Sequence, residues 1–425
     1  MKSMLLRRLV IEYNDEKKIL MIWWSMSEFE DKTYFLKSKN RTIASFSLHK
    51  QEIKQIFDGE EVWESSYEIG DLQVFLPSLL PHDLQSNCTP HSLKKWIEKR
   101  KVPKNRAFVE RIVHTYHSGQ SSNFLGYVDV SLGFSLNDAF WISPAQRDYR
   151  WESYNLYTNP FDSMLMQVAF NGISHKATGL VTTPEYTTNG ALRKCWRFSE
   201  GEVKLYKASS QPFANGGREA YGEYYTAQIA QAMGLECIAY GLEEFHGEIV
   251  SVCSLFTSED VGFLPMYSCL PQEARGLKKF ELLSEIQKIY TRETLADLML
   301  FDALIYNTDR HLGNFGMLFS NENNTFIKPA PIFDNGLCIF NFLTKDDLKN
   351  IKEALQDKVS SFDISFDQQL RVFLNKRHIP MLEKLTNFEF KKYPKFNLDD
   401  YWLDKISSFV QDRAKYAIEL AKTKA

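Results

Sequence analysis

The sequence predicts an α+β fold in which a β-rich lobe is followed by a mostly helical lobe, with an additional α/β region at the N-terminus. Two β-like runs at 192–198 and 203–207 surround a Gly turn and lead into a long helix at about 219–233. From Phe280 onward most of the pattern has helical periodicity, up to a last helix at about 403–422. Runs of strands before runs of helices are typical of the α+β class.

The composition indicates a globular protein with sizeable cores. Of the 425 residues, 44% are hydrophobic and 14% are aromatic. The net charge of -3 does not favour nucleic acid or an anionic membrane as a partner of the whole molecule. The six cysteines form no CxxC motif, which indicates core thiols rather than a zinc site. No apolar run approaches the roughly eighteen residues of a membrane span, so we expect a cytoplasmic protein without a membrane partner.

We divide the chain into four parts. They are a small α/β accessory region at 1–90, a helical hairpin with a connecting segment at 91–180, a β-rich lobe at 181–256 and a helical lobe with the catalytic loop at 257–425. Within the first part, short β-like runs alternate with one window at 48–57 whose periodicity predicts a helix.

The helical hairpin at 91–117 is rich in lysine and arginine between Lys94 and Arg111. One interpretation is a helix-turn-helix that contacts DNA phosphates. The favoured interpretation is a solvated surface, because runs of charge usually cover exposed faces. Direct binding of nucleic acid by this chain is therefore the less favoured prediction.

The segment from Phe301 to Gly316 carries the strongest chemical signal. A predicted helix at 292–306 leads into a polar turn, Asn307-Thr-Asp-Arg-His-Leu-Gly-Asn314, and then into a strand. Asp309 and Asn314 have the spacing by which a phosphotransferase loop presents a base to the attacking hydroxyl and an amide oxygen to a metal ion. We expect His311 to brace this loop by hydrogen bonding.

A second carboxylate, Asp334, follows a predicted β-hairpin. Carboxylate and amide oxygens suit Mg²⁺, which takes its remaining ligands from phosphates and water. Each of these residues alone would also be an ordinary turn residue. The occurrence of Asp309, Asn314 and Asp334 in this order, on a helix–loop–hairpin, favours the functional interpretation.

A lysine and a carboxylate further upstream complete the predicted site. Alternation along 203–207 places Lys207 on the apolar face of its strand. On the following helix Glu223 shares the inward stripe with alanines, so we pair Lys207 with Glu223 and keep Glu219 as the alternative.

A loop before that strand is placed to cover phosphates. Thr187, Thr188 and Gly190 would contribute hydroxyls and a permissive backbone, helped by Arg193 or Lys194. The loop contains no GxGxxG motif.

With these residues in place, the chain resembles the HipA-like serine/threonine kinases over roughly 180–345, chiefly in the Asn307-to-Asn314 loop. The resemblance implies a two-lobed, protein-kinase-like core. It implies that Asp309 is the catalytic base, that Asn314 and Asp334 bind Mg²⁺, and that Lys207, with Glu223 as its partner, binds the phosphates of ATP. Residues 1–180 and the Asn335-Gly336 sequence after Asp334 depart from the family pattern.

The resemblance also implies a function and partners. The expected activity is transfer of the γ-phosphoryl group from ATP to a serine or threonine of a protein, as in a toxin or regulatory kinase. An antitoxin-like DNA-binding partner protein and autophosphorylation at Thr187 or Thr188 are implied as well. The alternatives are a small-molecule or lipid kinase with the same core, and a DNA-binding regulator built on the 91–117 hairpin.

Overall fold

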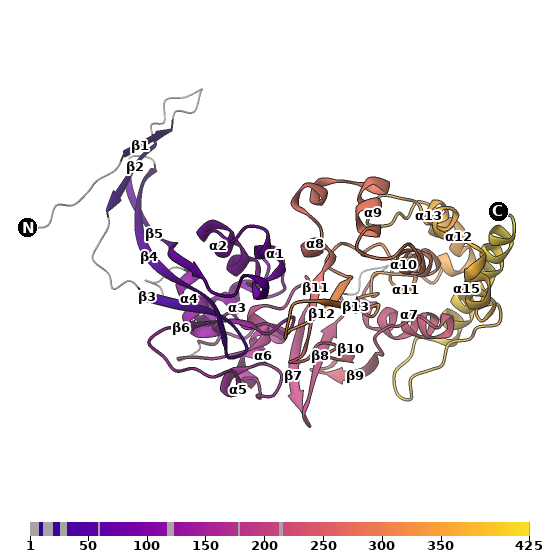
Figure 1. Cartoon of the computed structure of the whole chain (residues 1–425). Helices are drawn as coiled ribbons and strands as arrows, with labels where there is room; N and C mark the ends of the chain where they lie inside the picture. The colour runs from indigo at the N-terminus through magenta and orange to yellow at the C-terminus, as the bar shows by residue number, and fades with distance from the viewer. Residues whose placement is uncertain are drawn as a thin grey trace, which may run out of the picture. The chain divides into compact units, whose positions relative to one another are not determined.

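The computed structural model describes residues 8–11, 20–25, 32–57, 60–116, 123–176, 179–211 and 216–424. The chain forms two compact units, 1–190 and 191–425 (Figure 1). The four-part division predicted from the sequence stays a prediction in its finer boundaries. Among the described helices, none combines the length and the apolar character needed to cross a bilayer.

The N-terminal unit is built on an antiparallel sheet with the order β1-β2-β4-β3-β6, and β5 pairs with β4. Its strands are β1 Arg8–Ile11, β2 Leu20–Ser25, β3 Lys32–Ser38, β4 Arg41–Phe57, β5 Glu60–Val74 and β6 Phe140–Pro144. Its helices are α1 His82–Gln85, α2 Pro90–Lys99, α3 Val109–Tyr116, α4 Asn123–Ser131, α5 Trp151–Tyr154 and α6 Ser163–Asn171. Because β6 pairs with β3, the connecting segment belongs to the same sheet as the first ninety residues.

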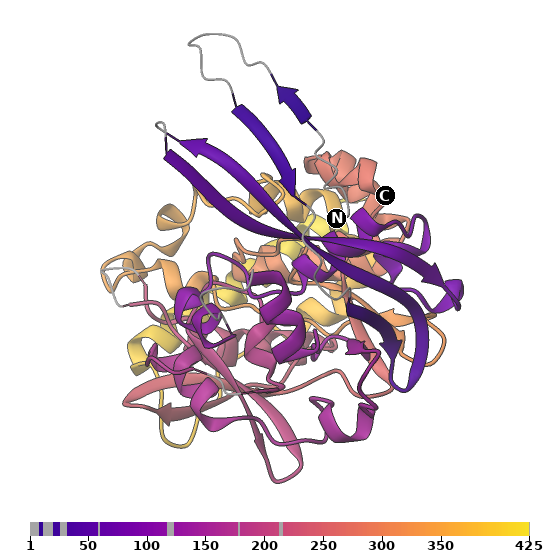
Figure 2. The ribbon, with the colours of Figure 1, turned by 90° about the vertical axis from the view of Figure 1, so that its left-hand side faces the viewer.

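The helix predicted at 48–57 is wrong. These residues form the second half of β4, which pairs continuously with β5 from Lys50 and Tyr67 to Phe57 and Glu60. Figure 2 shows the two strands as one long twisted ribbon. A ten-residue window can satisfy both periodicities, and the choice is made here by backbone pairing with a partner strand.

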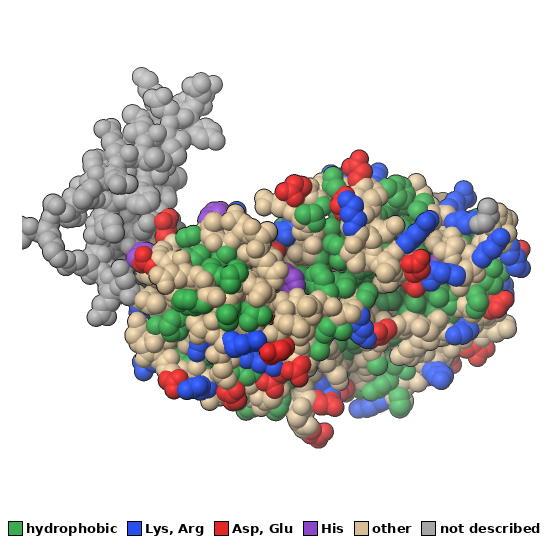
Figure 3. All heavy atoms as spheres, viewed as in Figure 1, with side chains coloured by type: hydrophobic (Ala, Val, Ile, Leu, Met, Phe, Trp, Pro, Cys, Tyr) green, Lys and Arg blue, Asp and Glu red, His purple; other side chains and the backbone are tan. Residues whose placement is uncertain are grey.

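Two helices, α2 and α3, form where the helical hairpin was predicted, but α2 packs mainly on β5 and α3 on α4 and α6. The positive charge of this stretch is not all on the surface. Arg100 is buried and forms a two-pronged ion pair with Asp138, with bonds of 2.7 and 2.9 Å. The side chain of Arg106 is also buried and lies 3.5 Å from Glu185. On the face drawn in Figure 3, the described Lys and Arg side chains lie among Asp and Glu side chains. These arginines therefore stabilise the unit from within, which weakens the DNA-binding interpretation.

The C-terminal unit begins with an antiparallel sheet of order β7-β8-β10-β9, and α7 packs against its strands. These elements are β7 Lys194–Ser199, β8 Glu202–Ala208, α7 Glu219–Met233, β9 Gly241–Phe245 and β10 Glu248–Ser254. Helix α7 ends at Gly234 with φ 81°, a left-handed conformation that glycine adopts without steric cost, as the sequence predicted.

The rest of this unit is mostly helical around a second antiparallel sheet, β11-β12-β13. The remaining elements are β11 Val261–Pro265, α8 Met266–Cys269, α9 Lys279–Gln287, α10 Arg292–Ile305, β12 Gly316–Ser320, β13 Phe326–Pro329, α11 Ile339–Phe342, α12 Ile351–Ala354, α13 Phe366–Phe373, α14 Ile379–Glu383 and α15 Asp400–Lys422. Apolar residues of α7, α10 and α15 share one buried core, which contains Ile229, Leu304 and Val410. This core fixes α7 and α10, the two helices that lead to the predicted site residues. The α+β class, with a β-rich part before a mostly helical part, is confirmed.

Candidate active site

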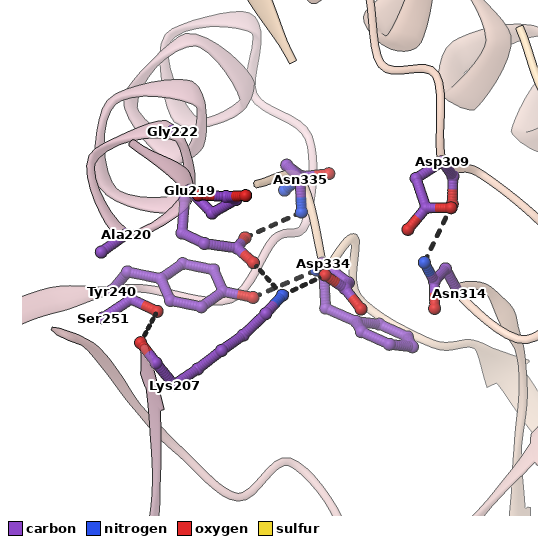
Figure 4. A network of polar contacts seen from close by, with 12 residues as sticks. Lys207, Glu219, Ala220, Gly222, Tyr240, Ser251, Asp309, Asn314, Asp334 and Asn335 are labelled. Atoms are coloured by element: carbon purple, nitrogen blue, oxygen red, sulfur yellow. Dashed lines mark hydrogen bonds and ion pairs between the residues drawn. The ribbon is translucent and has the colours of Figure 1, made fainter. Parts of the chain in front are cut away.

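Lys207 lies on β8, and two carboxylates hold its ammonium group. Its Nζ donates a 2.8 Å hydrogen bond to Oε1 of Glu223 on α7 and another to Oδ1 of Asp334 (Figure 4). Lys207 and Glu223 are both buried. The structure thus forms the predicted Lys207–Glu223 pair and adds Asp334 to it. The alternative partner, Glu219, instead accepts a 3.2 Å bond from the backbone N–H of Ser210.

Mutual attraction sets the charges of this cluster. Burial disfavours the ammonium of Lys207, but Asp334 and Glu223 outweigh burial and raise the pKa of Lys207. Burial also opposes ionisation of Asp334, yet Lys207 and Lys194 hold the pKa of that carboxyl well below its usual range. For Glu223 burial dominates and raises the pKa, although Lys207 opposes the shift. An ammonium between two carboxylates is the state that these contacts stabilise.

Lys194 adds a second positive charge beside Asp334. It lies on β7 directly opposite Lys207 of β8 and is buried. Residues directly opposite each other in a ladder share one face of the sheet. Both lysines therefore face the side of the sheet on which Asp334 lies, which would suit the charge of a polyphosphate.

The predicted catalytic loop starts where α10 ends. Tyr306 adopts a left-handed conformation with φ 55°, which turns the chain out of the helix. The amide of Asn307 then bridges two parts of the loop: its Oδ1 accepts a 3.0 Å bond from the N–H of Asp309, and its Nδ2 donates a 3.0 Å bond to Asp302. These bonds fix the backbone at Asp309.

Asn314 is oriented by the same loop. Its Nδ2 donates a 2.9 Å bond to the carbonyl of Asp309, so the amide oxygen is the end turned away from that bond (Figure 4). Burial raises the pKa of Asp309; His311 acts against this shift and Asp334 adds to it. A carboxylate with a raised pKa is a better proton acceptor than an ordinary aspartate.

His311 braces the loop from an exposed position. Its Nδ1 accepts a 3.0 Å bond from the N–H of Gly313. This geometry fits the bracing role that we expected for it.

Arg310 is a residue that the sequence analysis missed. Its buried guanidinium donates to the carbonyls of Asn314 at 2.9 Å and Phe333 at 2.6 Å, and to Asp302 of α10 at 3.0 Å. A buried charge is tolerated only when it is paired and hydrogen-bonded, as it is here. Arg310 thus joins the catalytic loop to the chain that precedes Asp334. The signal for it was Asp302, a carboxylate in the otherwise apolar second half of α10.

The segment after Asp334 packs closely on α7. Asp334 has φ 55°, and the next N–H, from Asn335, donates a 2.7 Å bond to Oε2 of Glu223. A Cβ added to Gly222 would lie 2.9 Å from the carbonyl oxygen of Gly336. The helix and the segment are therefore too close for any side chain at position 222. The backbone N–H after Asp334 therefore helps to position Glu223.

The predicted phosphate loop lies in the N-terminal unit. The hydroxyls of Thr187 and Thr188 donate to the carbonyl of Pro184 at 3.2 and 2.7 Å, and Gly190 has φ 89°. The assignment of these three residues to a nucleotide stays a prediction.

The residues around Asp334 fit a magnesium ion in their donor chemistry. The described residues contain no group of three His, Cys, Asp or Glu side chains that could hold a metal ion. Asn314 presents an amide oxygen, and Asp334 keeps a second carboxylate oxygen besides the one bound to Lys207. Few protein oxygens with the rest from phosphate and water is the usual pattern for Mg²⁺.

Comparison with known proteins finds that the chain is similar to kinases. No family model matches the chain. The serine/threonine-protein kinase CtkA of Helicobacter pylori is 26% identical over 162 residues, which cover 34% of this chain and 49% of that protein. The chain thus spans about half the length of this curated relative.

Two solved structures are similar at lower identity. A crystal structure of the Helicobacter pylori proinflammatory kinase CtkA is 19% identical with a TM-score of 0.45, and the match covers 56% of this chain and 92% of that one. A Shewanella oneidensis HipA, solved with HipB and operator DNA, is 10% identical with a TM-score of 0.48, over 92% of this chain and 100% of that one. The sequence match to CtkA confirms the predicted resemblance to serine/threonine kinases.

Proposed function

We propose that the chain is a Mg²⁺- and ATP-dependent kinase that transfers the γ-phosphoryl group to a serine or threonine hydroxyl of a protein. The observation that carries this proposal is the ammonium of Lys207 held between Glu223 and Asp334, beside the loop of Asp309 and Asn314. Phosphoryl transfer depends on positioning and charge stabilisation, and a cation aimed at the phosphates, metal ligands and a base are its recurring parts.

Each residue has a distinct task in this proposal. Lys207 and Lys194 bind phosphate oxygens, and Glu223 orients Lys207. Asn314 and Asp334 would hold Mg²⁺, which when bound neutralises charge on the phosphates. Asp309 accepts the proton of the attacking hydroxyl at its carboxylate.

The proposed acceptor and partners are supported by the relatives. A protein hydroxyl is the proposed acceptor because CtkA is named a serine/threonine-protein kinase. An antitoxin-like DNA-binding partner, a toxin or regulatory role and autophosphorylation at Thr187 or Thr188 are further parts of the proposal, and they come from the family resemblance.

Incubation with γ-labelled ATP and Mg²⁺ tests the proposal. We expect label on the chain or on proteins of a lysate, and a loss of at least about 10²-fold in Asp309→Asn, because a positioned general base contributes about 10²- to 10⁴-fold. Asp357→Asn, at an exposed aspartate, is the matched control and should label like the wild type. Equal labelling by Asp309→Asn and the wild type would refute the assignment of the base. Label found on small molecules but on no protein would refute the protein acceptor.

A further inference from the structure

A segment without regular secondary structure runs along the outer side of α7. It comprises residues 384–399, which connect α14 to α15, and we refer to it as the α14–α15 segment. The residues of α7 that bind it are Tyr224, Tyr225 and Gln228. With 3.6 residues per turn, Tyr225 and Gln228 lie about 160° and 140° around the helix from Glu223, on its opposite side, and Tyr224 lies about 100° away on the flank. The segment therefore contacts α7, the helix that carries Glu223, on the side that faces away from Lys207.

The side-chain amide of Gln228 binds the segment as a backbone group would. Its Oε1 accepts a 2.8 Å bond from the N–H of Lys391, and its Nε2 donates a 3.0 Å bond to the carbonyl of the same residue. The hydroxyl of Tyr224 donates a third bond to that carbonyl at 3.2 Å. Both backbone groups of one segment residue are thus satisfied by α7.

A second attachment lies further along the segment. The hydroxyl of Tyr225 donates a 2.9 Å bond to Oδ1 of Asn397. Asn397 also accepts from the N–H of Tyr393 and donates to its carbonyl, both at 2.6 Å, so the segment is folded on itself at this point. The ring of Phe390 packs edge-on against Tyr225 and Phe340, with centroids 5.3 and 5.4 Å apart.

The inner side of α7 is constrained as well. Gly222 abuts the carbonyl of Gly336, and Glu223 accepts from Asn335. The residue before the helix, Arg218, gives no side-chain cap to its first turn. The position of α7 is therefore set by what packs on its two sides, and the α14–α15 segment supplies the outer one.

We propose that the α14–α15 segment positions the proposed nucleotide site, with Gln228 and Tyr225 as positioning residues that hold α7 where Glu223 pairs with Lys207. The functional importance of this inference rests on the proposed function. The structural claim is that the Gln228–Lys391 bonds on one side of α7 stabilise the Lys207–Glu223 bond on the other side.

Chemical labelling of Lys207 tests this coupling in the full chain without any nucleotide. Acetic anhydride acetylates uncharged, accessible amines, so a buried and ion-paired lysine reacts slowly. Mass spectrometry measures the acetylation rate of Lys207 relative to that of the exposed Lys278. Gln228→Leu should raise the Lys207 rate several-fold, and Tyr225→Phe, which keeps the ring and loses one bond, should raise it less. Gln85→Leu also loses side-chain bonds to backbone carbonyls, to Ser78 and Leu80, and should leave the rate unchanged.

Repeating the measurement in a Glu223→Gln variant distinguishes an effect on the position of Glu223 from a general destabilisation of the fold. Glu223→Gln removes the charged partner of Lys207, so Gln228→Leu should add nothing to the labelling rate in that background. A Lys207 rate that is equal to wild type in both Gln228→Leu and Tyr225→Phe would overturn the inference, as would an equal increase in the Glu223→Gln background. Because labelling requires no phosphoryl transfer, a chain that fails the kinase assay but shows the predicted coupling retains the inference and loses the proposed function.

Discussion

At the scale of single residues, the site depends on one ammonium group that compensates two carboxylates. Glu223 is fully buried, and its other oxygen is bound to the N–H of Asn335. Replacing Lys207 would leave Glu223 and Asp334 without their shared cation. Uncompensated charge in such a place costs about 3–5 kcal/mol, which is far more than an exposed ion pair is worth.

We therefore predict that Lys207→Met makes stability depend on pH. Without the cation the pKa of Glu223 rises further above its unfolded value, so the folded state binds more protons than the unfolded state. Stability then falls as pH rises from the unfolded-state pKa of about 4.3 through the raised folded-state pKa of Glu223, by up to about 1.4 kcal/mol per pH unit for each proton. In the wild type the raised pKa of Lys207 keeps its contribution constant over this range, since that contribution is lost only at higher pH.

Thermal unfolding at several pH values checks this. Lys278→Met, at an exposed lysine, is the control and should follow the wild type. A Lys207→Met protein whose stability has the wild-type pH dependence would show that the two carboxylates are not held by Lys207.

The sequence could predict the carboxylates and the lysine of the site, but not the contacts of Arg310. The spacing of Asp309, Asn314 and Asp334 is local enough to be seen in a motif. Arginine in a polar loop is normally exposed, and only the fold brings it to Asp302 and to the carbonyl of Phe333. The joining of two distant loops by one side chain is a tertiary property.

At the scale of elements, the close approach of α7 to the segment after Asp334 is what brings Glu223 to Lys207. The helix comes so near because Gly222 has no side chain at the contact. Alanine at this position would raise helix propensity by up to about 1 kcal/mol. It would also place a methyl group against a backbone carbonyl that cannot turn away.

We predict that Gly222→Ala lowers the unfolding temperature, because overpacking of a tight contact costs about 1–3 kcal/mol and exceeds the gain in propensity. Gly276→Ala is the matched control, since a Cβ there would meet no atom within 4 Å. Differential scanning calorimetry of the two variants measures the effect. Equal unfolding temperatures would mean that α7 can withdraw from the segment without cost.

Strand and helix assignment shows where element-level prediction failed. The strands at β7 and β8 and the glycine end of α7 follow local rules and were predicted. The window at 48–57 was predicted as a helix because its apolar spacing suits one, whereas β5 supplies a partner along its whole length. Pairing with a strand that comes later in the chain leaves little mark on the first strand's own sequence.

At the scale of the whole molecule, the residues that we propose as metal ligands, base and phosphate-binding lysine all lie in the unit of residues 191–425. Lys207, Glu223, Asp309, Asn314 and Asp334 come from the sheet, α7, the catalytic loop and the segment after β13. The proposed function requires these residues to act on one ligand with separate tasks: Asp334 and Asn314 bind the metal, and Asp309 does not.

Binding of a non-hydrolysable ATP analogue, measured by calorimetry with and without Mg²⁺, tests this requirement most directly. We predict that Mg²⁺ tightens binding to the wild type and to Asp309→Asn by a similar factor, and that Asp334→Asn loses this dependence on Mg²⁺. Two results would contradict the proposed site: an affinity of the wild type for the analogue that does not change with Mg²⁺, or an Asp334→Asn protein that keeps the full effect of Mg²⁺ on affinity.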